Sequence, residues 1–600
     1  MHTFSERRIA LCLLVAFATL AFGASPANAQ LPKHALQQLP ASTAAAIVAG
    51  QANPAFDKLM QIGPVRAFNG PAFSSFRKAL QQRVPTNWLN GFPLPEQQAR
   101  QLLGDGSFGM VIVETSQQLP ERCFLLEMDA NYDDWRSLIK TYVSQAENDG
   151  AKVERTSLNG HELWLVSSPG QATGQAILRV KDWLVIGESR ECMQQWVAAA
   201  TTTTRLVDDQ RYTNTIGPMG GQYANEGDVW VFVDPLRLDY LDSRAGGQEL
   251  ASFAETFGAR HGFDAIRACG GWVNIGGPQY DASYRLRVWA PQPHDRGMQL
   301  LRWQAMENPS PSSWIPNDRV CSCVTIDWNL QPILKNLGPL VDEVIRETTG
   351  KSEQTLEAIL AQLRAEDGPG IDLEKDFMPL LGPRIEFISF FTPPASETAE
   401  QSIVAIELSN DREVADLLAA LIEDDGATPL EISGFPFELW KMGSGRRVGD
   451  SGPSFSTPGA MVAHGKLFFA SNYLALRQFV AIKPQPEPLA SDPTFQQLEA
   501  KLKTFAGEKP AMRIIAFPDR DFQNTYELLR TGRADSAESI YTTLLTPMLK
   551  DSTLKIPFEL LPTFDAIRPA LGPACIQMNV VPDGYEISGM TLSTAMPATP

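Results

Sequence analysis

The residues most suggestive of chemistry lie in the glycine-rich stretch LLGDGSFGMVIV at 102–113, which contains G-x-G-x-x-G-x-V. Glycines at this spacing form the phosphate loop of protein kinases, in which a lysine on a following strand contacts the phosphates. The first lysine after Gly109 is Lys140, too far along, and the chain has no H-R-D or D-F-G sequence. A dinucleotide loop needs the order strand, glycines, helix. Here the expected order is helix, glycines, strand, so we interpret the stretch as a helix-ending glycine before a strand and predict no cofactor.

A second motif resembles the start of a calcium-binding loop. Asp129, Asn131 and Asp133 have the spacing of the first three ligands. The sixth position of such a loop should be glycine and the twelfth glutamate, but they are Asp134 and Lys140. We therefore predict no metal site and expect these acidic residues to cap the helix that follows.

Two Ser-x-x-Lys pairs have the spelling of a penicillin-recognising nucleophile. They are Ser75 with Lys78 and Ser137 with Lys140, and neither S-D-N nor K-T-G accompanies them. G-x-S-x-G and H-E-x-x-H are also missing from the sequence. We interpret both pairs as solvated helix positions, and no catalytic residue is assigned.

The remaining polar and aromatic candidates have structural interpretations. Histidines with an expected structural or surface role are His34, His161, His261, His294 and His464. The acidic groups Asp208-Asp209 and Glu423-Asp424-Asp425 are expected at solvated loop and helix ends rather than as acid/base pairs. Trp164 and Trp440 could serve as carbohydrate platforms, but their equivalent places on alternating strands favour core packing.

The N-terminus has the layout of an export signal. Arg7 and Arg8 precede the apolar run 9–22, and the small residues 27–29 suit a signal peptidase. We predict that 1–29 is a signal peptide cleaved before Gln30, with a retained anchor as the alternative. The apolar run is short for a bilayer span and no similar run recurs, so no integral span is expected after cleavage. The predicted location is the periplasm or the exterior.

Composition restricts the class of partner. The chain has 600 residues and 44% apolar content, which is ordinary for folded domains. Removal of Glu6, Arg7 and Arg8 from the totals of 69 acidic and 51 basic residues leaves 68 and 49, a net charge of −19. Such a charge repels polyanions, so we expect neither nucleic acid nor an anionic membrane surface as a partner.

Six cysteines would remain after cleavage. They are Cys123, Cys192, Cys269, Cys321, Cys323 and Cys575. Export permits disulfides, and the even number is compatible with them. The alternating segment RVCSCVTIDW is expected to direct Cys321 and Cys323 to one strand face. Buried thiols or one or two structural disulfides are expected, and no metal ligand set is present at suitable spacing.

The chain reads as two copies of one unit. Trp135, Leu138, Ile139, Tyr142 and Val143 follow the spacing of one buried helix stripe, and the stripe recurs 279 positions later as Val414, Leu417, Leu418, Leu421 and Ile422. The segment 176–197 corresponds to 459–480, and 206–212 to 489–495, each 283 positions apart. FDAIR occurs at 263–267 and again at 564–568. This collinear series indicates an internal repeat.

The order of predicted elements defines a fold class. Sequential hairpins beside helices, with turns at Asn159-Gly160 and Ser433-Gly434, favour an α+β fold with mainly antiparallel sheets. We predict two tandem homologous lobes, at 30–300 with a helical lead-in and at 320–600. A Pro/Ser-rich join at 301–319 connects them, and 443–459 is expected to be a flexible excursion.

Several phrases resemble a known family. They are DVWVFVDPLRLDYL, DWNLQPILKNLGPLVDEV, LEKDFMPLLGPRIEFISFF and LPTFDAIRPALGPACI followed by PDGYEIS. They are similar to an uncharacterised domain-of-unknown-function family of exported bacterial, planctomycete-type proteins. The resemblance spans most of the mature chain and implies export and a repeated α+β architecture. It implies no reaction and no catalytic residues.

Two functional hypotheses follow. The first is an exported, non-catalytic envelope protein whose lobes bind an envelope protein or small ligand in the groove between them, because packing residues recur in both copies while polar ones such as Asp129, His161 and Lys181 do not. The alternative is an exported hydrolase with a site in one lobe only. A pocket with converging acidic or histidine groups in one lobe would favour the enzyme, and a broad apolar surface would favour binding.

Overall fold

The structure is a computed structural model of the whole chain. The residues it describes are 36–82, 103–116, 119–128, 132–167, 174–201, 205–219, 227–244, 257–276, 279–329, 337–343, 355–365, 369–422, 426–443, 457–482, 486–534 and 556–594. The predicted signal peptide and most of the predicted excursion at 443–459 lie outside them.

Ten strands and seven α-helices make up the first half of the described chain. The strands are β1 (Thr43–Ala49), β2 (Phe108–Glu114), β3 (Pro120–Glu127), β4 (Lys152–Leu158), β5 (His161–Ser167), β6 (Gln175–Val180), β7 (Trp183–Gly187), β8 (Val229–Val233), β9 (Ala268–Ile275) and β10 (Tyr280–Trp289). The helices are α3 (Ala52–Gln61), α4 (Gly63–Asn69), α5 (Ser74–Gln81), α7 (Tyr132–Asn148), α8 (Arg190–Thr201), α9 (Gln210–Thr215) and α10 (Pro235–Arg244).

The second half has a similar series of elements. Its strands are β11 (Trp303–Gln304), β12 (Val320–Trp328), β13 (Leu381–Phe391), β14 (Glu400–Leu408), β15 (Thr428–Leu430), β16 (Leu439–Lys441), β17 (Gly459–Ala463), β18 (Lys466–Ala470), β19 (Met512–Ala516), β20 (Ala574–Val581) and β21 (Gly584–Leu592). Its helices are α12 (Leu356–Arg364), α13 (Asp411–Ile422), α14 (Tyr473–Ala475), α15 (Pro493–Ala506) and α16 (Pro518–Arg530). FDAIR begins with a 3-10 turn in both halves, at Phe263–Ala265 and Phe564–Ala566.

Strand pairing follows the same order in both halves. In the first half the order is β4-β5-β6-β7-β3-β2-β1-β8-β9-β10, with every pair antiparallel. In the second half it is β15-β16-β17-β18-β14-β13-β12-β19-β20-β21. The mainly antiparallel α+β character therefore agrees with the sequence prediction. The duplication itself stays a prediction, which this matching order supports.

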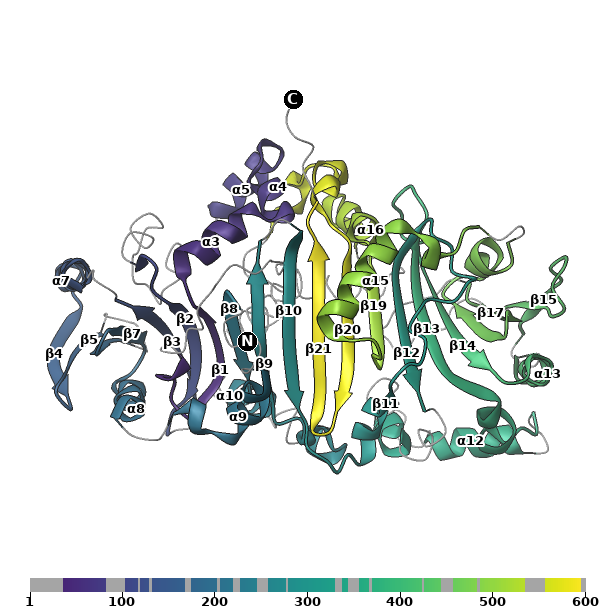
Figure 1. The fold of residues 1–600 in the computed structure, drawn as a ribbon, viewed down its shortest axis with the longest axis horizontal. Coiled ribbons are helices and arrows are strands. Elements are labelled where there is room, and N and C mark those ends of the chain that lie inside the picture. Colours follow the sequence, from purple (N-terminus) through teal and green to yellow (C-terminus); the bar gives the residue numbers. More distant parts are fainter. Residues whose placement is uncertain are drawn as a thin grey trace.

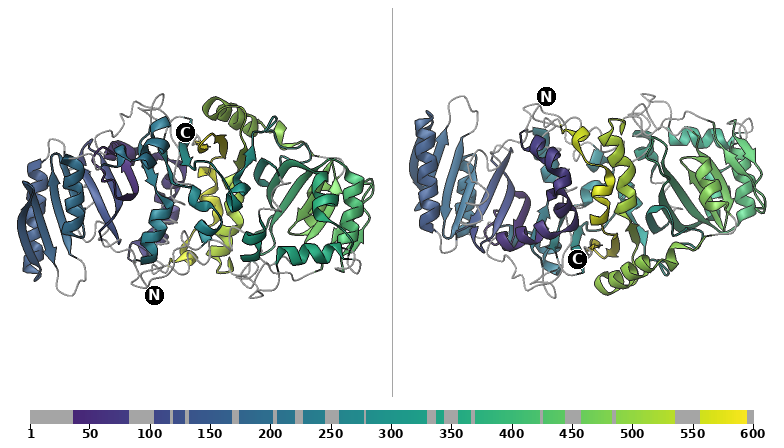
Figure 2. Two further views of the ribbon diagram at one scale, coloured as in Figure 1. Left: turned by 90° about the horizontal axis from the view of Figure 1, so that it is seen from below. Right: turned by 90° about the horizontal axis from the view of Figure 1, so that it is seen from above.

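The prediction of two separate lobes is wrong. Strand β10 of the first half pairs antiparallel with β21 of the second along their length, so the described strands form one 21-stranded sheet. Figure 1 shows these two strands side by side at the centre of the molecule. The two halves extend from this seam to opposite ends of an elongated body (Figure 2). An edge strand presents unpaired N–H and C=O groups, and their mutual pairing explains why the halves merge. Paired strands thus occupy the place of the expected groove.

The seam has a symmetric register. The strand pairs can be followed from the last residue of β8 in the first half and from the last residue of β19 in the second. Followed in this way, Val288 of β10 and Thr591 of β21 occupy equivalent positions, which are 303 residues apart in the chain. Arg285 is paired with Ser588, which also lies 303 positions later. The central residue of the seam therefore faces its own counterpart, as in an interface between two copies related by a twofold axis.

The helix stripes identified in the sequence face the sheet. Trp135 and Ile139 of α7 pack in a buried cluster with Trp164 of β5. Val414 and Leu418 of α13 pack in the same way with Trp440 of β16. The two tryptophans are buried side chains, so the prediction of core packing is confirmed.

The glycine-rich stretch is a helix end followed by a strand, as predicted. Gly104 has φ 51° directly after a helical residue, and β2 begins at Phe108. A Cβ atom at Gly106 would lie 2.8 Å from the Glu127 carbonyl oxygen. At Gly109 it would lie 3.1 Å from the Ile47 carbonyl oxygen. Close approach of neighbouring backbone, rather than phosphate binding, accounts for these glycines.

The predicted join packs against the second half. The backbone N–H of Ser312 donates to Glu386 Oε1 over 2.9 Å, and Trp314 Nε1 donates to Glu386 Oε2 over 3.3 Å. Lys466 Nζ lies 3.2 Å from the same Oε2 atom, and both charged side chains are buried. A buried charge needs an oppositely charged partner and hydrogen bonds. The predicted join donates two hydrogen bonds to Glu386.

The seam generates a stability prediction. A Cβ atom at Gly589 of β21 would lie 2.4 Å from Tyr284 Cζ on β10. We expect Gly589→Val to lower the free energy of unfolding by about 1–3 kcal/mol, since the overpacked strands must separate. Thermal unfolding followed by circular dichroism measures the effect. The control is Gly217→Ala, because no atom lies within 4 Å of an added Cβ at Gly217. Equal melting temperatures for Gly589→Val and the wild type would contradict the close packing of β10 against β21 at Gly589.

Candidate functional site

The Ser-x-x-Lys pairs occupy solvated helix positions, as predicted. Ser75 and Lys78 lie on α5, and Ser137 and Lys140 lie on α7. All four side chains are exposed. An activated serine needs a base held against it in a desolvated site, so neither pair forms a catalytic centre here.

The calcium-like motif lies partly outside the described residues. Asp129 and Asn131 are the two that lie outside. Asp133 and Asp134 are in the first turn of α7, where carboxylates complement the positive end of a helix. The group 423–425 lies outside as well. Asp209 accepts a hydrogen bond from the Arg211 backbone at the start of α9, which agrees with a helix-end role.

The histidines are dispersed over the structure. His161 follows the predicted turn, in which Asn159 and Gly160 have φ 49° and 84°, and His464 is exposed at the turn before Gly465. His294 is buried, and its Nε2 atom lies 2.8 Å from the Ala290 carbonyl oxygen. His34 lies outside the described residues.

One histidine makes a buried side-chain contact with a glutamate that the sequence analysis missed. His261 Nε2 lies 2.6 Å from Glu343 Oε2, and Arg260 Nη2 lies 2.7 Å from Glu343 Oε1. The pair joins residues 82 positions apart. It connects the end of the first half to a helical turn of the second, and we assign it a structural role.

The cysteines are free thiols in the described structure, and none contributes to a cluster of three or more potential metal ligands there. Cys321 and Cys323 do not share a face, contrary to the sequence expectation. They belong to separate buried clusters, together with Phe391 and Phe390 respectively. The register of β12 shifts between Val320 and Ser322, and such an irregularity changes the alternation of side chains along a strand.

A pocket of about 730 Å³ opens beside α13 in the second half. Its deepest side chains are those of Leu418, Trp440 and Val462, which are buried. The other residues that line it are Ala415, Asp416, Ala419, Glu431, Ile432, Ser433, Phe435, Pro436, Phe437 and Glu438. Its volume lies in the range of small-molecule sites, and polar atoms form more of its exposed lining than apolar atoms do.

Two local differences between the halves create this pocket. Ala415 and Ala419 stand one helical turn apart on α13, where the aligned positions of α7 hold Arg136 and Lys140. Ala415 and Ala419 line the pocket with short side chains, whereas the long side chain of Lys140 is exposed to solvent. In addition, β15 and β16 pair over only three residues each, whereas β4 and β5 pair over seven.

The hairpin predicted to turn at Ser433-Gly434 is therefore wider than expected. Strand β15 ends at Leu430 and β16 begins at Leu439, so residues 431–438 form a loop along the pocket. Pro429 and Pro436 lack the N–H group that a strand ladder requires, which favours the shorter pairing. This loop and the two alanines of α13 are differences from the first half that border the pocket.

The chemistry of the pocket combines aromatic rings with carboxylates. Phe435, Phe437 and Trp440 supply rings, and Asp416, Glu431 and Glu438 supply the exposed carboxylates. Among the described lining residues there is no lysine, arginine or histidine. Such a lining attracts an apolar group that carries a positive charge.

A buried polar cluster lies beneath α16 in the same half. Ser322 Oγ is 2.7 Å from Ser389 Oγ, and Ser389 Oγ donates to Asp521 Oδ1 over 3.4 Å. Asn524 accepts a 3.1 Å hydrogen bond from the Ser396 backbone N–H, and its Nδ2 atom is buried with no hydrogen-bond partner. The first half has apolar side chains at the aligned positions, namely Ala45, Ile112, Leu238 and Leu241.

Burial changes the acidity of this cluster. Desolvation raises the pKa of Asp521 to about 6, and the hydrogen bond from Ser389 only partly opposes it. Glu400, Asp519 and Arg520 are the other charged groups near this region, since they act together with Asp521 on the buried Cys321 thiol. Ser322 and Ser389 are each 5% exposed. None of the cluster residues lines the pocket.

Comparison with known proteins gives no family for this chain. No family model, no curated protein and no solved structure matches it. The resemblance to an exported planctomycete-type family stays a prediction. The functional argument therefore depends on the geometry of the pocket and of the buried cluster.

The buried cluster generates a prediction on pH dependence. Asp521 has a folded-state pKa raised above 3.8, so the folded state holds its proton more tightly than the unfolded state. Its contribution to stability is present below about pH 4 and is lost as the pH rises towards 6. We expect Asp521→Asn to remove this loss, which is on the order of 3 kcal/mol.

Urea unfolding of both proteins at several pH values between 4 and 8 measures this difference. Glu559→Gln is the control, because Glu559 is exposed and its titration should change little on folding. A wild type and an Asp521→Asn variant with parallel pH profiles would refute the assignment.

Proposed function

We propose that this chain is an exported, non-catalytic binding protein of the cell envelope and that its ligand occupies the pocket beside α13. The observation that carries the proposal is the combination of Ala415 and Ala419 with an open loop at 431–438 around one pocket. The aligned helix positions of the first half hold Arg136 and Lys140 instead, and the corresponding hairpin pairs over seven residues of each strand.

The lining residues favour an apolar ligand that carries an ammonium group. A cation over the face of Trp440, Phe435 or Phe437 gains about 0.5–2 kcal/mol from the ring quadrupole. Asp416, Glu431 and Glu438 add Coulomb attraction at the rim, where solvent weakens each contribution. The alanines and Ile432 leave room for the apolar part of the ligand.

Binding is favoured over the alternative of an exported hydrolase. A hydrolase needs a nucleophile or a base within reach of a bound substrate. Asp416, Glu431 and Glu438 line the pocket, but all three carboxylates are exposed to solvent rather than held together in a desolvated site. The buried set of Ser322, Ser389 and Asp521 is packed beneath α16 rather than along the pocket. Hydrolysis of a small fluorogenic ester that Asp521→Asn abolishes would support the hydrolase instead.

Export is supported by the N-terminal sequence. Arg7, Arg8 and the apolar run 9–22 precede an acceptable cleavage site. In the described part of the chain, no helix has both the length and the hydropathy for crossing a bilayer. The high negative charge suits a protein that meets cationic ligands by electrostatic steering.

A pair of isosteric probes tests the ligand class. One carries a trimethylammonium group and the other a neutral tert-butyl group on the same fluorescent aromatic amide. We expect the cationic probe to bind about tenfold more tightly, or about 1.4 kcal/mol, and to change the fluorescence of the protein because Trp440 lines the pocket. Glu431→Gln/Glu438→Gln should reduce this preference, while Glu559→Gln should leave it unchanged. Binding of neither probe would contradict the proposal.

Filling the pocket is an independent test of its location. Ala419→Leu introduces bulk without charge on the helix face that lines the cavity. We expect the affinity for both probes to fall at least tenfold, since the side chain takes the ligand's volume. Ala420→Leu is the matched control, because Ala420 is exposed on the same helix and does not line the pocket. Equal losses from the two variants would place the ligand elsewhere.

A further inference from the structure

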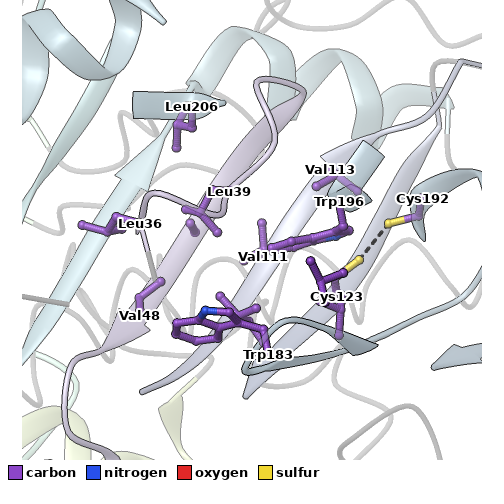
Figure 3. Close-up of a cluster of buried hydrophobic side chains, with 14 of the residues drawn as sticks. Leu36, Leu39, Val48, Val111, Val113, Cys123, Trp183, Cys192, Trp196 and Leu206 are labelled. Atoms are coloured by element: carbon purple, nitrogen blue, oxygen red, sulfur yellow. Dashed lines mark hydrogen bonds between the residues drawn. The ribbon is translucent and has the colours of Figure 1, made fainter. Parts of the chain in front are cut away.

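Two cysteines from distant parts of the first half meet in its core. Cys123 lies on β3 and Cys192 on α8, and their Sγ atoms are 2.9 Å apart. Both side chains are fully buried. Figure 3 shows the two sulfur atoms pointing at each other beside Trp196, in the cluster that also contains Val111 and Val113.

This separation is shorter than ordinary packing produces. Non-bonded carbon atoms pack at about 3.5–4.0 Å, and sulfur is a larger atom than carbon. A disulfide requires an S–S distance of about 2.03–2.05 Å. A movement of less than about 1 Å would therefore bring these two atoms to bonding distance.

The second half shows that the fold does not need cysteine at these places. Strand register aligns Cys123 with Ile403, and the offset of 283 positions aligns Cys192 with Ala475. Ile403 and Ala475 are both buried in the apolar core of the second half. The two positions are thus both cysteine in one half and both aliphatic in the other, as expected for residues that act as a pair.

We propose that Cys123 and Cys192 form a structural disulfide in the exported protein. The reaction is thiol–disulfide exchange with an oxidised disulfide-carrying oxidoreductase of the envelope. A thiolate of the pair attacks the donor's S–S bond, and the second cysteine then displaces the donor from the mixed disulfide. One S–S bond forms between Cys123 and Cys192, and the donor leaves as a dithiol with the two electrons and two protons.

The bond would fasten α8 to the sheet at a point that already has polar anchors. Glu121 of β3 accepts hydrogen bonds from the backbone of Glu188 and from the Ser189 hydroxyl, at 2.7 and 2.6 Å. The cross-link joins residues 69 positions apart, and closing a long loop restricts the unfolded chain. The folded state of the first half is stabilised as a result.

Oxidation has to precede completion of the core. Folding leaves both thiols inaccessible to a protein donor, and the side-chain hydrogen bond between the two cysteines together with burial raises the pKa of the Cys192 thiol. The thiolate is the nucleophile in exchange, so the pair reacts during folding and is then protected from reductants.

Thiol counting on the full chain tests the pair. The protein is produced with its own N-terminal segment in a bacterium that exports it, denatured, and alkylated with and without prior reduction. We expect four of the six remaining cysteines to react before reduction, all six after it, and one cross-linked peptide containing Cys123 and Cys192. A count of six before reduction, or a bond between other cysteines, would overturn the proposal.

A second arm does not depend on export. Reduced full-length protein is unfolded and refolded with oxidised or with reduced glutathione, and the thermal midpoint of each product is measured. We expect the oxidised product to melt several degrees higher.

The double variant Cys123→Ile/Cys192→Ala, which carries the residues of the second half, should melt at one temperature in both buffers. The single variant Cys269→Ala, a control at a distant thiol, should behave like the wild type. Identical midpoints for the oxidised and reduced wild type would overturn the stabilising role.

Discussion

The pairing of β10 with β21 is the constraint on which the rest of the structure depends. Both strands would otherwise be long sheet edges with unpaired backbone donors and acceptors, and each satisfies the other along the seam. The symmetric register around Arg285 and Ser588 lets two similar halves meet through the same strand. That contact is made of backbone hydrogen bonds, so paired strands rather than a groove join the two halves. The pocket described above lies within the second half.

The second half departs from the first at aligned positions of the same scaffold. Small side chains replace long ones on α13, which opens the pocket, and polar side chains replace an apolar cluster beneath α16. Neither change improves packing, because an open pocket loses contacts and the buried Asp521 carboxylate loses its hydration. Features that cost stability in one copy only are those expected to serve a function. The first half specialises differently, through the close pair Cys123 and Cys192.

Local patterns predicted local structure well. The stripe of Trp135 and Ile139 faces the core of the first half, and Asn159 and Gly160 adopt the positive φ angles that a tight turn requires. The matching turn at Ser433-Gly434 is also present, with Gly434 at φ 81°, but the strands beside it pair only from Leu430 and Leu439 outward. Cys321 and Cys323 illustrate the same limit, because a shift of register cannot be read from alternation alone.

The sequence by itself indicated many of the helices and strands and aligned the two halves, since periodicity and turn chemistry act over a few neighbouring residues. The predicted helical lead-in was wrong in part, because β1 (Thr43–Ala49) lies within it and pairs with β2 and β8. The tertiary structure alone decided that β10 adjoins β21, that the alanines of α13 face Trp440, and that Cys123 meets Cys192. Each of those contacts joins residues that are far apart in the chain, and the free energy that selects them comes from strand pairing and burial across the whole sheet.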